Sequence, residues 1–174
     1  MNMKINNVAP RFARFQTVVD NKLVRGRAVT CPLRLYKMKK AGITQIVDLR
    51  NTSYIERPLE KFFCKMLGIK YENFKYPKGL SVIPEKKFFD GINNAIVNNS
   101  GKTYIHCQSG KRRTGVCVAV YEREHSLKAT GQIISKMLKS GFKDMIYGRH
   151  CAKRDRLIGV YNDFMQKYFP HGGV

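Results

Sequence analysis

Acidic residues and long apolar segments are scarce in this sequence. Its 174 residues contain 12 Asp+Glu against 33 Lys+Arg, giving a formal net charge of +21 at pH 7. No stretch approaches the about 18 consecutive apolar residues of a membrane-spanning helix, and no apolar run followed by a small-residue cleavage site opens the chain. We therefore expect a soluble, cytoplasmic protein.

Paired cysteines are also lacking. The cysteines are odd in number, and no two of them form a C-x-x-C pair: Cys31, Cys64, Cys107, Cys117 and Cys151. This pattern indicates neither a disulfide framework nor a zinc site, and we expect no metal and no other cofactor. At least one cysteine is free to do chemistry.

The positive charge predicts polyanionic partners without naming a reaction. Nucleic acid, an acidic membrane surface and phosphorylated ligands would all be attracted. The basic residues are spread along the chain, with the longest run at 111–113, so they form no tail or arm. A solvated surface accounts for most of them.

Segments of helical and strand periodicity alternate, which predicts one α/β domain with a central, mostly parallel sheet and a helix-rich C-terminal half. In the first helix, Leu33, Tyr36 and Met38 are expected to form the apolar stripe. The expected helices cover residues 32–41, 57–67, 84–96, 115–123, 127–140 and 153–169, and the expected strands 43–49, 69–74 and 103–107. We expect residues 1–21 to be an extension, 22–169 the domain and 170–174 a tail.

One stretch, residues 104–115, carries the chemistry. An apolar strand ends in Cys107, five residues follow, and Arg113 precedes a helix. A loop between a strand and a helix N-terminus gathers backbone N–H groups around one point, which makes an anion site. The same positive potential favours a thiolate, so Cys107 is expected to be nucleophilic. Arg113 can offer a planar fork to two phosphate oxygens.

This His-Cys-x5-Arg-Thr-Gly pattern resembles the signature loop of cysteine-dependent tyrosine and dual-specificity phosphatases. The segments 23–27 and 46–50 are similar to those that open the compact atypical members of bacterial and plant-fungal type. The resemblance implies a tyrosine-phosphatase-like fold and a cysteinyl-phosphate on Cys107, with Thr114 bonded to the thiolate and His106 orienting the loop. It also implies that the loop holds the phosphoryl group with Gln108, Ser109, Gly110, Lys111, Arg112 and Arg113.

The general acid departs from the family pattern. Lys78 follows Pro77 where the resemblance places an aspartate that protonates the leaving oxygen. Glu85 is our candidate acid, and Glu72 and Asp90 are the nearby alternatives. Asp48, which ends an upstream strand, is expected to organise a neighbouring loop.

Several functions stay open at this point. Without the aspartate, phenols and phosphoanhydrides leave more readily than alkyl oxygens, which favours phosphotyrosine or an anhydride. The leading hypothesis is a phosphotyrosine or dual-specificity phosphatase acting on a phosphorylated protein or a polyphosphorylated small molecule. The alternatives are cleavage of inositol pyrophosphates, phosphoinositides or RNA 5′-triphosphates, and a phosphate-binding pseudophosphatase. Pairing of Cys107 with Cys64 or another cysteine would provide a redox brake.

Overall fold

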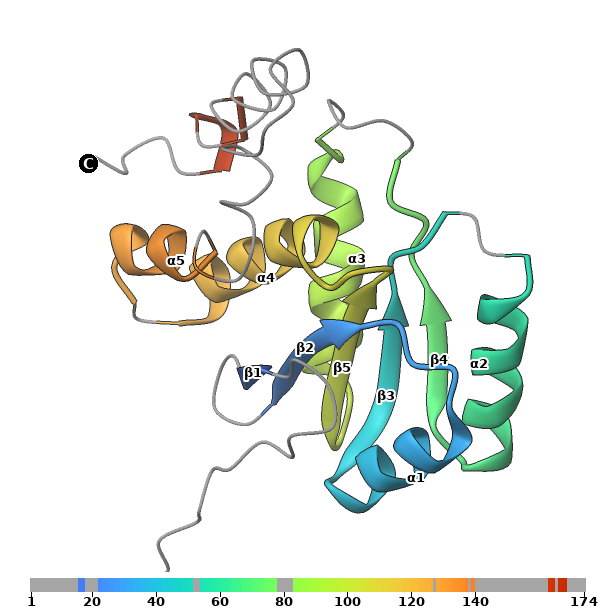
Figure 1. Cartoon of the computed structure of the whole chain (residues 1–174). Helices are drawn as coiled ribbons and strands as arrows, with labels where there is room; N and C mark the ends of the chain where they lie inside the picture. The colour runs from blue at the N-terminus through green and yellow to red at the C-terminus, as the bar shows by residue number, and fades with distance from the viewer. Residues whose placement is uncertain are drawn as a thin grey trace, which may run out of the picture.

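The computed structural model describes residues 16–17, 22–51, 54–77, 83–126, 128–137, 139, 163–164 and 166–168. A five-stranded sheet, in the order β1-β2-β5-β3-β4, forms the centre of the molecule (Figure 1). Only β1 is antiparallel to its neighbour among the described strands. The strands are β1 (Gln16–Thr17), β2 (Leu23–Arg27), β3 (Ile43–Asp48), β4 (Lys70–Asn73) and β5 (Lys102–Cys107).

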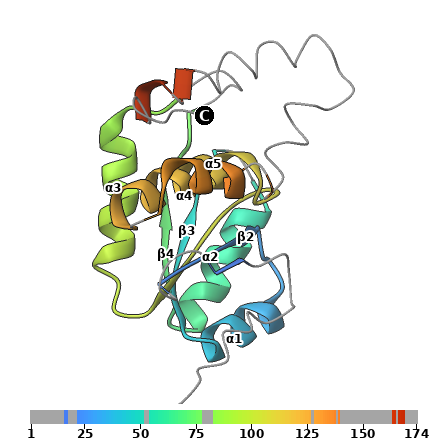
Figure 2. The ribbon, with the colours of Figure 1, turned by 90° about the vertical axis from the view of Figure 1, so that its left-hand side faces the viewer.

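Helices cover both faces of this sheet, as Figures 1 and 2 show. One face carries α1 (Pro32–Lys40) and α2 (Glu56–Met66). The other carries α3 (Lys86–Val97), α4 (Arg112–His125) and α5 (Thr130–Met137). The predicted single α/β domain with a mostly parallel central sheet is thereby confirmed. None of the described helices is long and apolar enough to cross a membrane.

Two apolar clusters hold the layers together, because alternate side chains of a strand point to opposite faces. Ile105 and Cys107 of β5 belong to the cluster under α3, α4 and α5. Tyr104 of the same strand belongs to the cluster under α1 and α2. The central strand β5 therefore ties both halves of the core to the residue that carries the predicted chemistry.

Some expected element boundaries and faces differ from those observed. Helix α4 begins at Arg112, three residues earlier than expected, so Arg113 lies in its first turn. In α1, Leu35 and Met38 are buried, whereas Leu33 and Tyr36 are 61% and 46% exposed. The predicted stripe was wrong for these two residues, because the helix turns its other apolar pair toward the sheet.

The expected helix at 153–169 lies mostly outside the described residues, as does Cys151. Its described part packs on the core. Phe164 is buried, and the Tyr168 ring lies edge-on to Phe89 with ring centroids 5.0 Å apart. The Tyr168 hydroxyl donates to the Pro84 carbonyl at 2.8 Å, which fixes the chain just before α3.

Candidate active site

Cys107 ends β5 at the carboxyl edge of the parallel sheet, between β2 and β3. Ligands of open α/β sheets bind at this edge. Residues 108–111 connect Cys107 directly to α4, whose N-terminus therefore adjoins the sulfur. The Cys107 side chain is 96% covered, since only 4% of it is exposed. The strand, loop and helix thus place a cysteine in the setting that the sequence predicts.

The loop after Cys107 depends on a glycine. Gly110 has φ 69°, in the left-handed region that residues with a Cβ rarely adopt. A Cβ there would also lie 2.2 Å from the carbonyl oxygen of Gly26 on β2. Loop and strand can therefore approach this closely only with glycine at position 110.

The loop favours the thiolate form of Cys107. Burial by itself raises the pKa of the thiol, but hydrogen bonds from the Thr114 hydroxyl and from the backbone N–H groups of Thr114, Gly110 and Ser109 outweigh burial, and the pKa is lowered. The Thr114 hydroxyl is buried beside this sulfur. Four donors thus converge on one sulfur atom.

Arg25, on β2, is a functional residue that sequence reasoning missed. Its side chain is 97% buried, with 3% exposed, and Nη2 donates to the carbonyl oxygens of Gly110 at 2.8 Å and Lys111 at 3.1 Å. Burial lowers the pKa of Arg25, while the negative charge of Cys107 raises it. The hydrogen bonds from Arg25 therefore orient two loop carbonyls away from the sulfur, so that the loop N–H groups face it. In the sequence, Arg25 entered only as part of the segment 23–27 that resembles the family.

The basic side chains expected to bind phosphate lie at the start of α4. Lys111, Arg112 and Arg113 are all partly exposed. Burial and the neighbouring Arg113 charge lower the pKa of Arg112, so the two guanidinium groups are close enough to repel each other. A bound anion would relieve that repulsion.

Gln108 and Ser109 are exposed at the mouth of the loop. The Gln108 amide Nε2 donates to the carboxylate Oε2 of Glu56 at 2.9 Å. Glu56 is the first residue of α2, 52 positions away in sequence, and its side chain is half exposed. Sequence reasoning missed Glu56, because nothing local indicates that α2 begins beside the loop.

The His106 side chain lies on the opposite face of β5 from that of Cys107 and contacts the backbone where the loop begins. Its Nδ1 is 3.2 Å from the Cys107 carbonyl oxygen, and Nε2 is 3.2 Å from Oε1 of Glu60. Burial lowers the pKa of His106, but the Glu60 and Asp48 carboxylates outweigh it, so the pKa is raised. His106 therefore lies between the loop backbone and the Glu60 carboxylate.

Beneath His106 lies a buried network of charges. Arg50 donates to both carboxylate oxygens of Asp48 at 2.8–3.0 Å and also bonds Glu60. Tyr71 adds a further hydrogen bond to Asp48. Asp48 also accepts from the Arg50 backbone N–H at 2.8 Å, so it organises the chain after β3, the role expected for it.

Asp48, Glu60 and His106 are also the one group of described residues with metal-ligand character, since one ligand atom of each lies within 4.8 Å of the others. The donor set does not fit a cation, because the Arg50 guanidinium already places a permanent positive charge against both carboxylates. The raised pKa of His106 also disfavours the neutral ring that a metal needs. This cluster is an ion-pair network that supports the loop.

The candidate acids occupy varied settings. Glu85 is highly exposed just before α3, and its carboxylate pairs with Lys87 at 2.9 Å. A hydrogen bond from Lys87 and the Lys87 charge lower the pKa of Glu85, which does not favour a proton donor. Asp90 pairs with Lys86 at 2.7 Å, and Glu72 with Lys70. Lys78 lies outside the described residues.

A redox brake that pairs Cys107 with Cys64 does not fit the structure. Cys64, on α2, belongs to the cluster under α1 and α2, whereas Cys107 belongs to the cluster on the other face of the sheet. All four described cysteines are free. Cys117 shares the Cys107 cluster, but burial raises its pKa well above the usual value, so its thiol is unreactive.

The chain has the fold of the cysteine-dependent tyrosine and dual-specificity phosphatases, as the resemblance predicted. No family model and no curated protein matches the sequence.

Particular solved structures share the fold over most of the chain. The core catalytic domain of the PP-IP phosphatase SIW14 from S. cerevisiae is 19% identical, with 87% of this chain and 93% of that chain covered and a TM-score of 0.60. A PTP-like phytase from Bdellovibrio bacteriovorus is 12% identical, with coverages of 91% and 84% and a TM-score of 0.61. TpbA from P. aeruginosa is 13% identical, with coverages of 89% and 87% and a TM-score of 0.59.

Proposed function

We propose that this protein is a metal-independent phosphatase that forms a cysteinyl-phosphate on Cys107. The observation that carries the proposal is the position of a buried cysteine at the N-terminus of α4, where loop N–H groups lower its pKa. A thiolate stabilised in this way is a nucleophile at neutral pH, and the same donors suit phosphoryl oxygens. The chemistry needs no metal, because the loop itself supplies the nucleophile and the positive charge.

In the proposed reaction, the Cys107 sulfur attacks phosphorus, and the bond from phosphorus to the leaving oxygen breaks. Arg113 and the loop N–H groups bind the non-bridging oxygens, whose charge they offset. Water then attacks the cysteinyl-phosphate, which releases inorganic phosphate and restores the thiolate. His106 and Arg25 act as positioning residues, since their contacts run through the loop backbone.

The leaving oxygen must take up a proton or leave as an anion. Among the described residues, Glu56 is the carboxylate that contacts the exposed loop, through Gln108. Glu56 is therefore a stronger candidate for the acid than Glu85, whose pKa is lowered by Lys87. A site with so exposed an acid suits leaving groups that need little protonation, namely phenols and phosphoanhydrides.

A phosphotyrosine or other aryl phosphate is our leading substrate class. Anhydride cleavage in a polyphosphorylated small molecule is the second candidate, favoured by the three consecutive basic residues at the mouth, Lys111, Arg112 and Arg113. The structural likeness to a PP-IP phosphatase and to a phytase supports the same candidate. A single phosphoryl group would neutralise only part of this positive charge, and additional phosphates on a substrate would bind to the rest.

A substrate panel tests the proposal. The purified protein should hydrolyse an aryl phosphate in the presence of a chelator, and Cys107→Ser should abolish turnover while retaining the fold. Rates on phosphotyrosine peptide, inositol pyrophosphate and triphosphorylated RNA rank the substrate classes. Tight retention of phosphorylated ligand without any phosphate release by the intact protein would instead identify a pseudophosphatase.

A further inference from the structure

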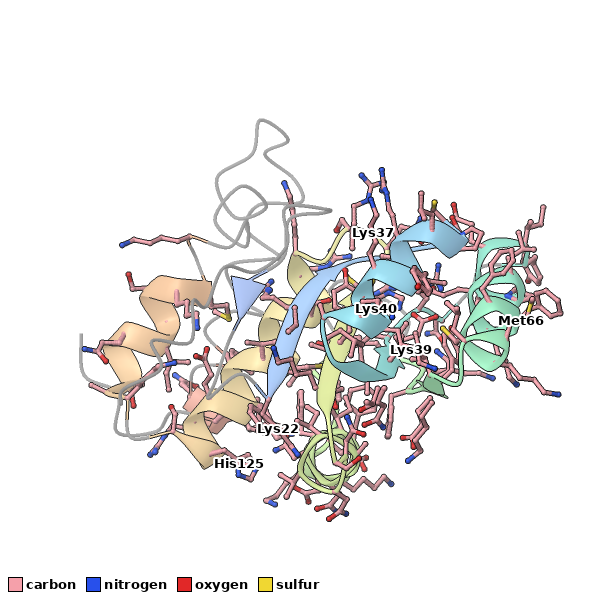
Figure 3. The ribbon with its side chains drawn as sticks, turned by 90° about the horizontal axis from the view of Figure 1, so that it is seen from below. Lys22, Lys37, Lys39, Lys40, Met66 and His125 are labelled. Atoms are coloured by element: carbon pink, nitrogen blue, oxygen red, sulfur yellow. The ribbon has the colours of Figure 1, made fainter. Side chains whose placement is uncertain are left out.

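The outward side of α2 is apolar, although the helix is already packed against the sheet by its other side. Ile55, Leu59, Phe62 and Met66 are 74%, 44%, 56% and 68% exposed. Their spacing of four, three and four residues places them in one line along the helix. We call these four residues the apolar stripe. Figure 3 shows Met66 on the outer side of α2, away from α1.

A line of cations runs along another side of α2. Arg57, Lys61 and Lys65 are spaced four residues apart, so they share one side of the helix, and the first two line a pocket with Tyr71 and Asn73 of β4. We call them the basic row. In the described part of the chain, no carboxylate lies within ion-pair distance of these three residues.

An open pocket of about 400 Å³ adjoins the basic row. Two of its five lining residues, Arg57 and Lys61, are cationic, and the others are Pro58, Tyr71 and Asn73. The Arg57 guanidinium is held at the pocket by the Asn73 side-chain oxygen at 3.3 Å. The pocket therefore offers room and positive charge for an anionic group on the β4 side of α2.

Helix α1, next to α2, also exposes apolar and cationic side chains. It exposes Leu33 and Tyr36, and Figure 3 shows Lys37, Lys39 and Lys40 along it, next to α2. The ammonium group of Lys40 lies 5.7 Å from the centre of the Tyr36 ring. Of the carboxylates on the two helices, Glu60 is buried and Glu56 lies at the end of α2 beside the catalytic loop. Away from that end, the outward face of both helices is cationic and apolar.

We propose that this face docks the protein on an anionic lipid bilayer, with the apolar stripe at the boundary between headgroups and acyl chains. Apolar side chains flanked by lysine and arginine are the two components of interfacial membrane binding. A bilayer accepts protruding side chains without a matching groove, and each cation near an anionic surface adds to binding. Lysines on flexible stems suit a laterally mobile headgroup layer better than a fixed protein epitope.

The charge argues against a second copy of this chain as the occupant. Pairing two such faces would bring two basic rows together on molecules that each carry a net charge of +21. Docking would also leave the catalytic loop near the surface, because Glu56, at the first turn of α2, is bonded to Gln108. The lipid partner is inferred from the two helices alone, so it stands or falls independently of the phosphatase proposal.

Sedimentation of the full chain with vesicles tests this inference. We expect binding to phosphatidylcholine–phosphatidylserine vesicles, none to phosphatidylcholine alone, and a fall in binding as salt is raised. Phe62→Ser/Met66→Ser should lower the partition coefficient by about tenfold or more, because both side chains lose their apolar contact with lipid. Lys61→Gln/Lys65→Gln should also lower it by about tenfold.

Matched controls change exposed side chains elsewhere. Val97→Ser on α3 and Arg123→Gln on α4 should leave vesicle binding unchanged, and thermal unfolding checks the fold of every variant. Failure of the wild-type chain to bind anionic vesicles would overturn the inference, as would equal binding by the Phe62→Ser/Met66→Ser variant. A wild-type dimer in light scattering that this variant converts to a monomer would assign the face to a second copy instead.

Discussion

Replacing Arg25 by Met should slow catalysis although Arg25 does not touch the substrate. The change removes two charge-assisted hydrogen bonds, to the carbonyls of Gly110 and Lys111 at 2.8 and 3.1 Å. Hydrogen bonds to charged groups contribute about 1.5–3 kcal/mol each. If the transition state loses stabilisation equal to the free energy of one such hydrogen bond, kcat/KM falls by about 10- to 100-fold. The positive charge near Cys107 is lost as well, so the pKa of its thiol should rise.

The assay is kcat/KM for an aryl phosphate as a function of pH, together with the rate of Cys107 alkylation by iodoacetamide. In Arg25→Met the acidic limb of both profiles should move to higher pH. The profiles of Arg25→Lys should lie between those of Arg25→Met and the wild type, since lysine keeps the positive charge but not the planar guanidinium that bonds two carbonyls. A folded Arg25→Met protein with wild-type kcat/KM and an unmoved alkylation profile would refute the role of Arg25.

Three further predictions concern the site. Arg50→Met should lower the free energy of unfolding by about 3–5 kcal/mol, because it leaves two buried carboxylates uncompensated, and urea denaturation should show this loss; a change below about 1 kcal/mol would contradict the network. Thr114→Val should raise the pKa of Cys107, so that activity appears at higher pH as the thiolate forms; an unchanged pH–rate profile would exclude the hydroxyl as a donor to sulfur. Glu56→Gln should slow alkyl phosphate hydrolysis more than aryl phosphate hydrolysis, whereas Glu85→Gln should not; the reverse order would return the acid to Glu85.

Local sequence patterns predicted much of the fold. The strands at 43–48 and 102–107 are rich in β-branched and aromatic residues, which favour strands. Gly42 and Gly68, with φ of 87° and 63°, lie where the first two helices end. The signature loop was predictable for the same reason, since all of its parts are contiguous in the chain. In α1 the pattern was ambiguous, because Leu33 with Tyr36 and Leu35 with Met38 have the same spacing. Only packing against the sheet decides between the two pairs.

The supporting residues could not be predicted, because their partners are distant in sequence. Arg25 bonds a carbonyl 85 positions away, and Gln108 meets Glu56 across 52 positions. A buried arginine also contradicts the ordinary expectation that charged residues lie at the surface. Such contacts depend on strand order, which places β2 directly beside β5, and no local pattern encodes that order.

Trapping the intermediate on Cys107 tests the account most directly. The protein is mixed with an aryl phosphate in chelator, quenched in acid on the millisecond scale, digested and examined by mass spectrometry. We predict one phosphoryl group on the peptide that contains Cys107, which disappears in Cys107→Ser and forms at the rate of the phenol burst. Turnover of the substrate with no phosphoryl group on that peptide, or undiminished turnover by Cys107→Ser, would contradict the account.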